Sequence, residues 1–350
     1  MTKLFNSFMQ EQPEILAAIA ADGARIAAPL LAFCEEQPER IFLLGSGSSY
    51  NAAFACADLI RKLLRVEVTC ITPTLLPDQP LPDGLVLALS QSGTSTSTFD
   101  VVRKLQQEGR KVLLLTAQPD SLIGNQADAC VLVECGPEPV GPKTKGATAT
   151  MMTLLVCMLE LAKAHGTAED ALLAEVAQSL QAVSAQVAKA LASGAAFFAG
   201  RDDIAAMGQM MLVADAKGYG AGLECALKLL ETCWLPVFLY EFEEFMHGIH
   251  YAVGQGSNLL FLLPKGGPER VRMLRLAGFA ADNGAASILL DTDEGCDGAH
   301  LIVSTNEITR PFALVAFFQA LCGPLSQARG INCDIPRYPE FGKIMDTKRL

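Results

Sequence analysis

The alternation of short apolar runs with helical patterns constrains the fold of this chain more than any other feature. The runs lie at 40–44, 66–71, 85–89, 111–116 and 129–133 in the first half, and at 195–199, 237–240, 258–263, 286–290 and 301–303 in the second. Strands that alternate with helices in this way form parallel sheets with crossover helices. We therefore expect an α/β protein with two doubly wound parallel sheets, each flanked by helices in a flavodoxin-like, three-layer α/β/α arrangement.

The two halves begin alike, which indicates an internal duplication. IFLLGSG at 41–47 is similar to AFFAGRD at 196–202, and the stretch 166–193 between the halves is alanine-rich with few turn signals. We expect that stretch to be a helix packed across both halves rather than a flexible linker. The predicted order is an N-terminal helical arm (1–38), a first domain (39–165), a helical connection (166–193), a second domain (194–335) and a C-terminal tail (336–350).

Composition and charge argue against several classes of protein. Of 350 residues, 27 are Lys or Arg and 38 are Asp or Glu, a net charge of −11 without a basic run, which disfavours a nucleic-acid partner. The apolar stretch at 146–159 is too short to cross roughly 30 Å of hydrocarbon, and the charged opening 1–14 lacks the pattern of a secretory signal. None of the 11 cysteines forms a CxxC pair. We expect a soluble cytoplasmic protein without a membrane partner.

Two glycine- and hydroxyl-rich segments follow predicted strands of the first half. GSGSSY at 45–50 lies between a strand and the helical run 52–64, and SQSGTSTST at 90–98 follows the third strand. Strand-to-helix turns present backbone N–H groups and the positive end of a helix dipole, and small hydroxyl residues let an anion approach closely. Neither segment has the spacing of a dinucleotide GxGxxG turn or of a Walker loop.

Each segment alone is equally consistent with a plain turn that caps a helix. On strands that are neighbours in a doubly wound sheet, however, both meet in one crevice at the carboxyl edge, where such folds bind ligands. The pair therefore predicts a site for a small phosphorylated metabolite rather than for a nucleotide.

The segment 220–234 has the pattern of an amphipathic helix with two stripes. One stripe is apolar and contains Leu223, Leu227, Leu230 and Trp234; the other is charged and contains Glu224, Lys228 and Glu231. The charged stripe is consistent with a solvated face on which Glu224 and Lys228 pair weakly. It is also consistent with acid–base chemistry.

Two of the four histidines, His247 and His250, follow this helix. An imidazole together with a carboxylate is the usual equipment for moving protons between oxygen and carbon in a sugar. The histidines could instead bind a metal with Glu243 or Glu244, but HExxH is absent and two histidines three residues apart are a weak signal. We expect no metal and no cofactor.

In order and spacing, these motifs resemble the double SIS (sugar isomerase) domain family, which includes the isomerase half of glucosamine–fructose-6-phosphate aminotransferase and the fructosamine-6-phosphate deglycases. The matching segments are 11–13, 47–51, 90–93, 144–145, 224–231 and 247–248. The resemblance implies that each half is an SIS domain. It also implies that the sugar phosphate is held by Gly47, Ser48, Ser49, Ser90, Gln91, Ser92 and Ser95.

The resemblance further implies catalytic roles in the second half. Glu231 would move a proton between C1 and C2 of the sugar, His247 would open the sugar ring, and Glu224 would shape the pocket. In the family this histidine reaches the site from the partner subunit, which implies a homodimer with shared active sites. The tail only loosely resembles that of the aminotransferase, whose lysine forms a Schiff base, and Lys343 is the candidate for that lysine.

The chain departs from the family pattern at three places. Thr2 stands where the aminotransferase has the cysteine nucleophile of its glutaminase domain, Lys143 replaces a serine, and residues 209–218 are interpreted as an insertion. The leading hypothesis is a deglycase that splits a 6-phosphorylated sugar–amine adduct, such as fructoselysine or glucoselysine 6-phosphate, into hexose 6-phosphate and amine. The alternatives are an aldose–ketose or amino-sugar-phosphate isomerase/deaminase that uses free ammonia, and a non-catalytic phosphosugar sensor.

Overall fold

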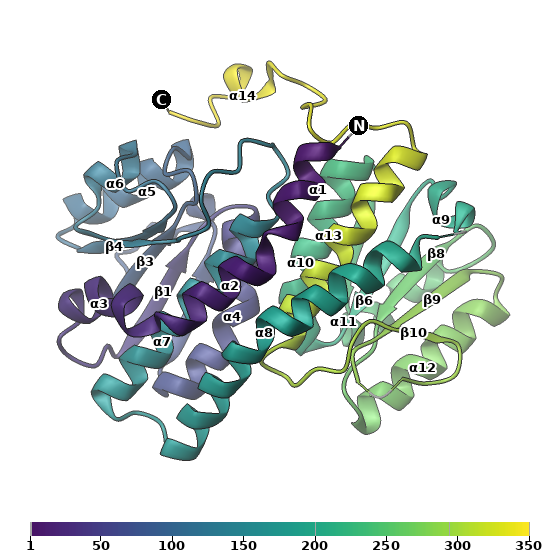
Figure 1. Cartoon of the computed structure of the whole chain (residues 1–350), viewed down its shortest axis with the longest axis horizontal. Helices are drawn as coiled ribbons and strands as arrows, with labels where there is room; N and C mark the ends of the chain where they lie inside the picture. Colours follow the sequence, from purple (N-terminus) through teal and green to yellow (C-terminus); the bar gives the residue numbers. More distant parts are fainter. Residues whose placement is uncertain (1, 200, 294, 350) are drawn as a thin grey trace. The chain divides into compact units, whose positions relative to one another are not determined.

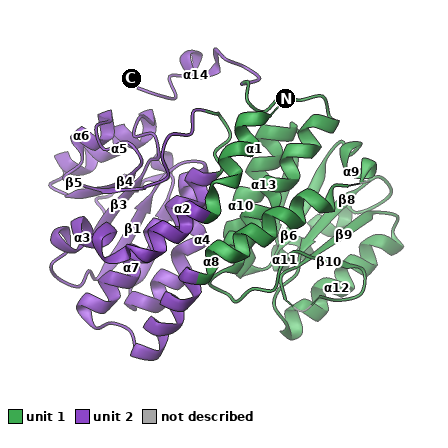
Figure 2. Cartoon of the chain, in the orientation of Figure 1, with its two compact units in different colours: residues 1–13, 140–144, 182–335 green, residues 14–139, 145–181, 336–350 purple. Residues whose placement is uncertain are grey.

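The computed structural model describes residues 2–199, 201–293 and 295–349. The chain forms two compact units, each assembled from separate segments (Figure 2). Unit 1 contains Met1–Pro13, Val140–Thr144 and Ala182–Ile335, and unit 2 contains Glu14–Pro139, Lys145–Gln181 and Pro336–Leu350. The units thus differ from the predicted domains, which are continuous: the first residues join the unit of the second half, and the tail joins the unit of the first half.

Unit 2 is built around a parallel five-stranded sheet with the strand order β2-β1-β3-β4-β5 (Figure 1). The strands are β1 (Arg40–Leu44), β2 (Glu67–Ile71), β3 (Leu85–Leu89), β4 (Val112–Thr116) and β5 (Ala129–Leu132). β3 and β4 are buried along their whole length. Central strands covered on both faces are apolar without alternation, which explains their leucine- and valine-rich sequences.

The helices of unit 2 supply the rest of its core. They are α2 (Gln12–Ala21, beginning in unit 1), α3 (Gly23–Phe33), α4 (Ser48–Leu64), η1 (Pro73–Leu75), α5 (Thr96–Gln107), α6 (Leu122–Gln126), α7 (Lys145–His165) and α14 (Phe341–Ile344). Phe42 and Leu114 on the sheet pack with Val102 and Leu105 on α5 in one buried cluster. Apolar contacts with α5 therefore help to hold the sheet that carries the hydroxyl-rich segments.

Unit 1 contains a second parallel five-stranded sheet, with the order β10-β9-β8-β6-β7. Its strands are β6 (Met210–Ala214), β7 (Val237–Glu241), β8 (Asn258–Leu262), β9 (Ala286–Asp291) and β10 (Ala299–Leu301). Its helices are α1 (Lys3–Gln10), the end of α8 (Asp170–Phe197), α9 (Asp202–Ala205), α10 (Ala216–Cys233), α11 (Phe242–Met246), η2 (Ile249–Ala252), α12 (Gly267–Asp282) and α13 (Arg310–Ala328). The predicted fold class, two helix-flanked parallel sheets, is confirmed.

The first strand of the second sheet is β6, and the prediction that placed it at 195–199 is wrong. That stretch holds the end of α8, because its alanines continue the helical pattern of the connection. Residues 209–218, interpreted as an insertion, instead hold all of β6 and the start of α10. In the fold β1 corresponds to β6, so the sequence similarity between 41–47 and 196–202 does not mark corresponding strands. β10 lies two residues before its predicted position.

Helices α7 and α13 are each long and apolar enough by length and composition to cross a membrane. In α7, 83% of the most apolar window is buried inside the protein, and in α13 the share is 78%. Both therefore serve as core helices of their units in this structure. α7 runs for 21 residues and is therefore longer than the apolar stretch 146–159 that was judged too short to cross a membrane.

The contact between α8 and α13 in unit 1 gives a test of the fold. A Cβ added at Gly194 on α8 would collide with the carbonyl oxygen of Phe317 on α13, and Ala320 is also close. Gly194→Ala should therefore lower the free energy of unfolding by about 1–3 kcal/mol through overpacking. A Cβ at Gly278, a helical glycine on α12, meets nothing within 4 Å. Gly278→Ala is the matched control, and chemical denaturation should show it neutral or stabilised by up to about 1 kcal/mol; equal midpoints for the two variants would contradict the packing.

Candidate functional site

The turn after β1 presents the start of a long helix at the carboxyl edge of the first sheet. Gly47 precedes α4 with φ +56°, a conformation that favours glycine, and an added Cβ there would meet nothing within 4 Å. Its carbonyl accepts the first helical hydrogen bond, from the N–H of Asn51 at 2.9 Å. Ser48 and Ser49 form the first turn of α4. The expected strand-to-helix turn is present at this edge.

The hydroxyl-rich segment after β3 lies at the same sheet edge, because β3 pairs directly with β1. Ser90 is buried, and its N–H donates to Leu115 on β4 at 3.1 Å. The Gln91 amide donates to the sulfur of Cys135 at 3.6 Å. Ser95 is the N-cap residue of α5, and its hydroxyl accepts from Thr98 at 3.1 Å. The structure therefore brings Gly47–Ser49 and Ser90–Ser95 to one edge; their binding roles remain predictions.

The C-terminal tail lies along this second segment, which the sequence did not predict. Lys348 forms an antiparallel bridge with Ser95, and the N–H of Thr96 donates to the carbonyl of Thr347 at 3.2 Å. The N–H of Arg349 donates to the carbonyl of Thr94 at 2.8 Å. The side chain of Arg349 pairs with Asp100 at 3.1 Å. Lys343 is on α14 of the same tail and is exposed.

The charged stripe of α10 in unit 1 is buried, which excludes the alternative of a solvated face. Glu224 is 3% exposed and Lys228 is fully buried. The ammonium of Lys228 lies 3.1 Å from a carboxylate oxygen of Glu224 and also contacts Glu231. Leu230 and Trp234, by contrast, are 42% and 37% exposed. The helix is therefore turned opposite to the expectation for an amphipathic surface helix, in which the apolar stripe faces the core.

The side chain of Glu231 is 31% exposed, at the open end of this charged cluster. Burial raises its pKa above the ordinary value, whereas the nearby charges of Lys228 and Lys143 act to lower it. Burial acts against the ammonium of Lys228, but attraction to Glu224 and Glu231 outweighs it and raises the pKa of Lys228. A half-buried carboxylate with a raised pKa beside a fixed cation is suited to take up and return a proton.

Lys228 is the residue of this cluster that sequence reasoning missed as a functional group. Its spacing to Glu224 (i, i+4) and to Glu231 (i, i+3) was visible in the sequence, but it was interpreted only as a possible surface ion pair. Lys143 lies in the short segment of unit 1 at 140–144, and its ammonium donates to the carbonyl of Val140 at 3.0 Å. The carbonyl of Thr144 in the same segment accepts from the buried amide of Gln319 on α13 at 3.2 Å.

His247 follows α11 and is 70% exposed. Its Nε2 atom lies 3.9 Å from Glu243, and in the described part of unit 1 no hydrogen bond or ion pair joins His247 to Glu231. The ring of His250 stacks near Tyr251, with centroids 4.3 Å apart. Among the residues that the structure describes, no group of three or more His, Cys, Asp or Glu side chains is arranged to hold a metal ion. The predicted imidazole and the predicted carboxylate thus make no direct interaction in the described part of unit 1.

The chain is similar to known proteins in sequence. Residues 36–159 match the SIS domain. The glutamine–fructose-6-phosphate aminotransferase of Pyrobaculum aerophilum is 27% identical over 338 residues, which cover 93% of this chain and 55% of that protein. The chain spans about half the length of the curated relatives it matches.

Solved structures share the fold over the whole chain. A proposed phosphosugar isomerase from Clostridium difficile 630 has a TM-score of 0.86 at 24% identity, covering 100% of this chain and 99% of the other. The C-terminal domain of glucosamine-fructose-6-phosphate aminotransferase from Francisella tularensis has a TM-score of 0.85 at 19% identity, covering 96% and 99%. The protein thus carries an SIS domain and is homologous to the isomerase part of the glucosamine–fructose-6-phosphate aminotransferases.

Proposed function

We propose that the protein is a deglycase that hydrolyses a 6-phosphorylated sugar–amine adduct, of the fructoselysine or glucoselysine 6-phosphate type, to hexose 6-phosphate and free amine. The observation that carries the proposal is the buried ion cluster of α10, in which Lys228 is held between Glu224 and a half-buried Glu231. Such a cluster fits proton transfer between sugar carbons better than it fits simple binding, because an isolated binding site does not need a carboxylate of raised pKa.

In this proposal the hydroxyl-rich turns hold the phosphate, which makes the carbon chemistry effectively unimolecular. For a fructosamine adduct, His247 protonates the ring oxygen and the C2 hydroxyl loses its proton, which opens the ring to a C2 ketone. Glu231 takes a proton from C1 and returns it to C2, while the nitrogen loses a proton and the C2 oxygen gains one, so that the double bond moves from C2–oxygen to C1–nitrogen. Water then adds to C1, the C1–nitrogen bond breaks, and the amine leaves with a proton.

We also propose that the enzyme is a homodimer in which His247 serves the site of the partner subunit. Two observations support this. His247 is largely exposed and is not bonded to Glu231 within the described part of unit 1. The apolar stripe next to Glu231 on α10 is also partly exposed, with Leu230 at 42% and Trp234 at 37%. Exposed apolar side chains beside a site are typical of a surface that another chain covers.

The second candidate function is an amino-sugar-phosphate isomerase or deaminase, which uses the same proton transfer without hydrolysis of an adduct. The similarity to the isomerase part of aminotransferases favours it. Incubation with fructoselysine 6-phosphate and, separately, with glucosamine 6-phosphate distinguishes the two. Release of lysine and glucose 6-phosphate from the first supports the deglycase, release of ammonia from the second supports the deaminase, and tight binding without either product would indicate a sensor.

Replacement of Glu231 by glutamine tests the proposed proton carrier. Glu231→Gln removes the base and keeps the shape of the side chain, so we expect turnover to disappear while sugar-phosphate binding stays within a few fold. The measurements are product release and titration calorimetry. Glu175→Gln, at an exposed glutamate on α8, is the control and should keep full activity. Turnover at the wild-type rate in Glu231→Gln would remove this residue from the mechanism.

Mixing of two inactive variants tests the shared site. In a dimer formed from one Glu231→Gln chain and one His247→Ala chain, one of the two sites has both wild-type groups if His247 acts across the interface. After denaturation and refolding of an equal mixture, random pairing should restore about a quarter of the wild-type activity. Neither variant refolded alone should recover activity. No recovery in the mixture would place His247 and Glu231 in the same subunit.

The charge of Lys228 should determine the pH at which kcat/KM rises on the acid side of its pH profile. Its charge lowers the pKa of Glu231, so Lys228→Met should raise that pKa. The active carboxylate form would then appear only at higher pH, and the rising limb of kcat/KM should shift upward. Lys228→Arg keeps the charge and should keep the limb close to its wild-type position. The exposed Lys62→Met is a second control. An unshifted limb in Lys228→Met would mean that Glu231 is not the titrating base.

A further inference from the structure

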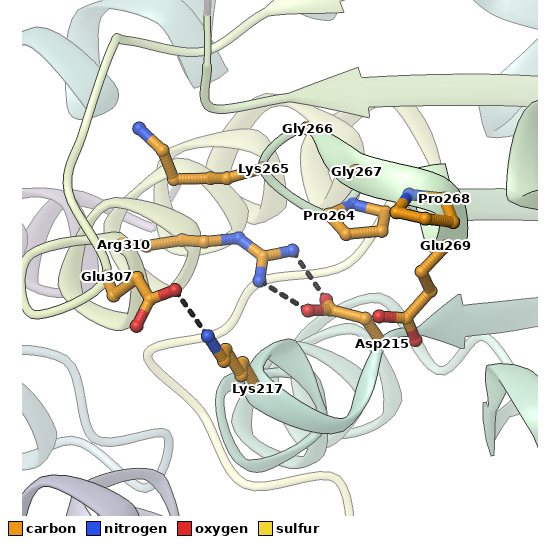
Figure 3. Close-up of a pocket in the computed structure, with 10 residues that line it drawn as sticks. All are labelled: Asp215, Lys217, Pro264, Lys265, Gly266, Gly267, Pro268, Glu269, Glu307 and Arg310. Carbon is orange, nitrogen blue, oxygen red and sulfur yellow. Dashed lines mark hydrogen bonds and ion pairs between the residues drawn. The ribbon is translucent and has the colours of Figure 1, made fainter. Parts of the chain in front are cut away.

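The second sheet has a cavity of its own at its carboxyl edge, entirely within unit 1 (Figure 3). Its volume is about 170 Å³. The walls come from the turn between β6 and α10, from the loop between β8 and α12, and from the segment that starts α13. None of the residues assigned above to phosphate binding or proton transfer lines it.

The position of this cavity corresponds to the predicted phosphate crevice of the first sheet. Read from its other edge, the second sheet has the order β7-β6-β8-β9-β10, which matches β2-β1-β3-β4-β5 strand for strand. β6 and β8 therefore correspond to β1 and β3, the neighbouring strands whose chain connections leave in opposite directions. In doubly wound sheets this switch point is where ligands bind. The cavity thus lies at the switch point of the second sheet.

The loop after β8 offers backbone donors to this cavity. α12 is a 16-residue helix that begins at Gly267, and Gly266 before it makes no side-chain cap. Gly266 and Gly267 have φ values of +61° and +76°, and a Cβ added to either would meet nothing within 4 Å. The first N–H groups of a helix have no partner within the helix and can bind an anion; in α12 Pro268 has no N–H, so Gly267 and Glu269 supply the first two. Lys265 precedes them, and its ammonium lies 3.2 Å from Asp293.

Arg310 is the second and independent sign of a ligand. It lines the cavity, is 3% exposed, and places two guanidinium nitrogens 2.9 and 2.6 Å from the carboxylate of Asp215 (Figure 3). Another hydrogen bond, of 3.0 Å, goes to the carbonyl of Leu263. Its Nε–H, however, has no acceptor among the residues that the structure describes. A buried donor without an acceptor is costly, and an oxyanion in the cavity would supply one after a small adjustment.

Each cation that lines the cavity has a carboxylate partner, so a bound anion competes with these partners. Asp215 is neutralised by Arg310, and Glu307 is paired with Lys217 at the rim (Figure 3). Lys265 is paired with Asp293, and Glu269, in the first turn of α12, is the remaining carboxyl of the lining. Burial and the charges of Asp215 and Glu241 raise the pKa of Glu269, which favours its neutral form.

We propose that this cavity is a second ligand site, which binds the phosphate group of a small molecule or free phosphate through the start of α12, Lys265 and Arg310. It is separate from the predicted phosphate loops of the first sheet. Because it uses neither Glu231 nor His247, a molecule bound there is not turned over.

The test counts bound phosphate per chain in the full-length protein by ³¹P NMR and titration calorimetry. Ser92→Asp places a negative charge in the first-sheet loop and should leave one site, whereas Lys265→Glu should weaken that remaining site at least about tenfold. Glu269→Gln removes a negative charge and should tighten it. Titrations with inorganic phosphate and with glucose 6-phosphate show whether the site takes the free anion or a sugar phosphate. Lys62→Glu, an exposed lysine on α4, is the charge control and should bind as wild type.

Two results would overturn the proposal. The first is that Ser92→Asp binds no phosphate. The second is that adding Lys265→Glu or Glu269→Gln to Ser92→Asp leaves its phosphate affinity within twofold in both cases. Circular dichroism, together with binding at the first-sheet loop of Lys265→Glu, verifies that this variant is folded. The outcome is independent of the proposed deglycase activity, because a protein without turnover can still show the second site and an active one can lack it.

Discussion

The placement of Lys228 between two carboxylates is the interaction on which the proposed chemistry depends. A fully buried ammonium is unfavourable unless carboxylates and good geometry compensate its lost hydration, and removal of one partner from such a cluster typically costs about 3–5 kcal/mol. Glu224 and Glu231 provide that compensation from the same helix. The helix must therefore keep its charged stripe inside, which leaves part of its apolar stripe exposed. The inward orientation of the charged stripe thus explains both features: burial raises the pKa of Glu231 against the effect of Lys228, and part of the apolar stripe is left on the surface.

The two sheets share one topology but carry different side chains at corresponding strand ends. After β1 and β3 the chain has mainly glycine, serine and threonine. After β6 the chain places Asp215, whose carboxylate is held by Arg310. The same place in the fold is thus lined by small hydroxyl groups in one sheet and by buried charge pairs in the other. This difference fits two sites with different roles better than two copies of one site.

Features that depend on local pattern could be predicted from the sequence. The apolar runs of β1 to β5, the hydroxyl-rich turns and the helix that carries Glu231 all follow from periodicity and turn residues within short windows. The first strand of the second sheet was predicted wrongly because 196–202 is similar in sequence to 41–47. Met210–Ala214 is more apolar and forms the strand. The burial of Lys228 could not be predicted, since the pattern of its helix points the opposite way and only tertiary packing decides between the two faces.

The antiparallel contact between the tail and the loop at 94–96 links the end of the chain to the first-sheet crevice. The Thr96 N–H can donate one good hydrogen bond, and it donates to the carbonyl of Thr347. A ligand oxygen at that N–H would displace this carbonyl, and the tail would lose one of its main-chain bonds to the loop. A ligand that used this N–H would therefore be thermodynamically coupled to the docking of the last residues.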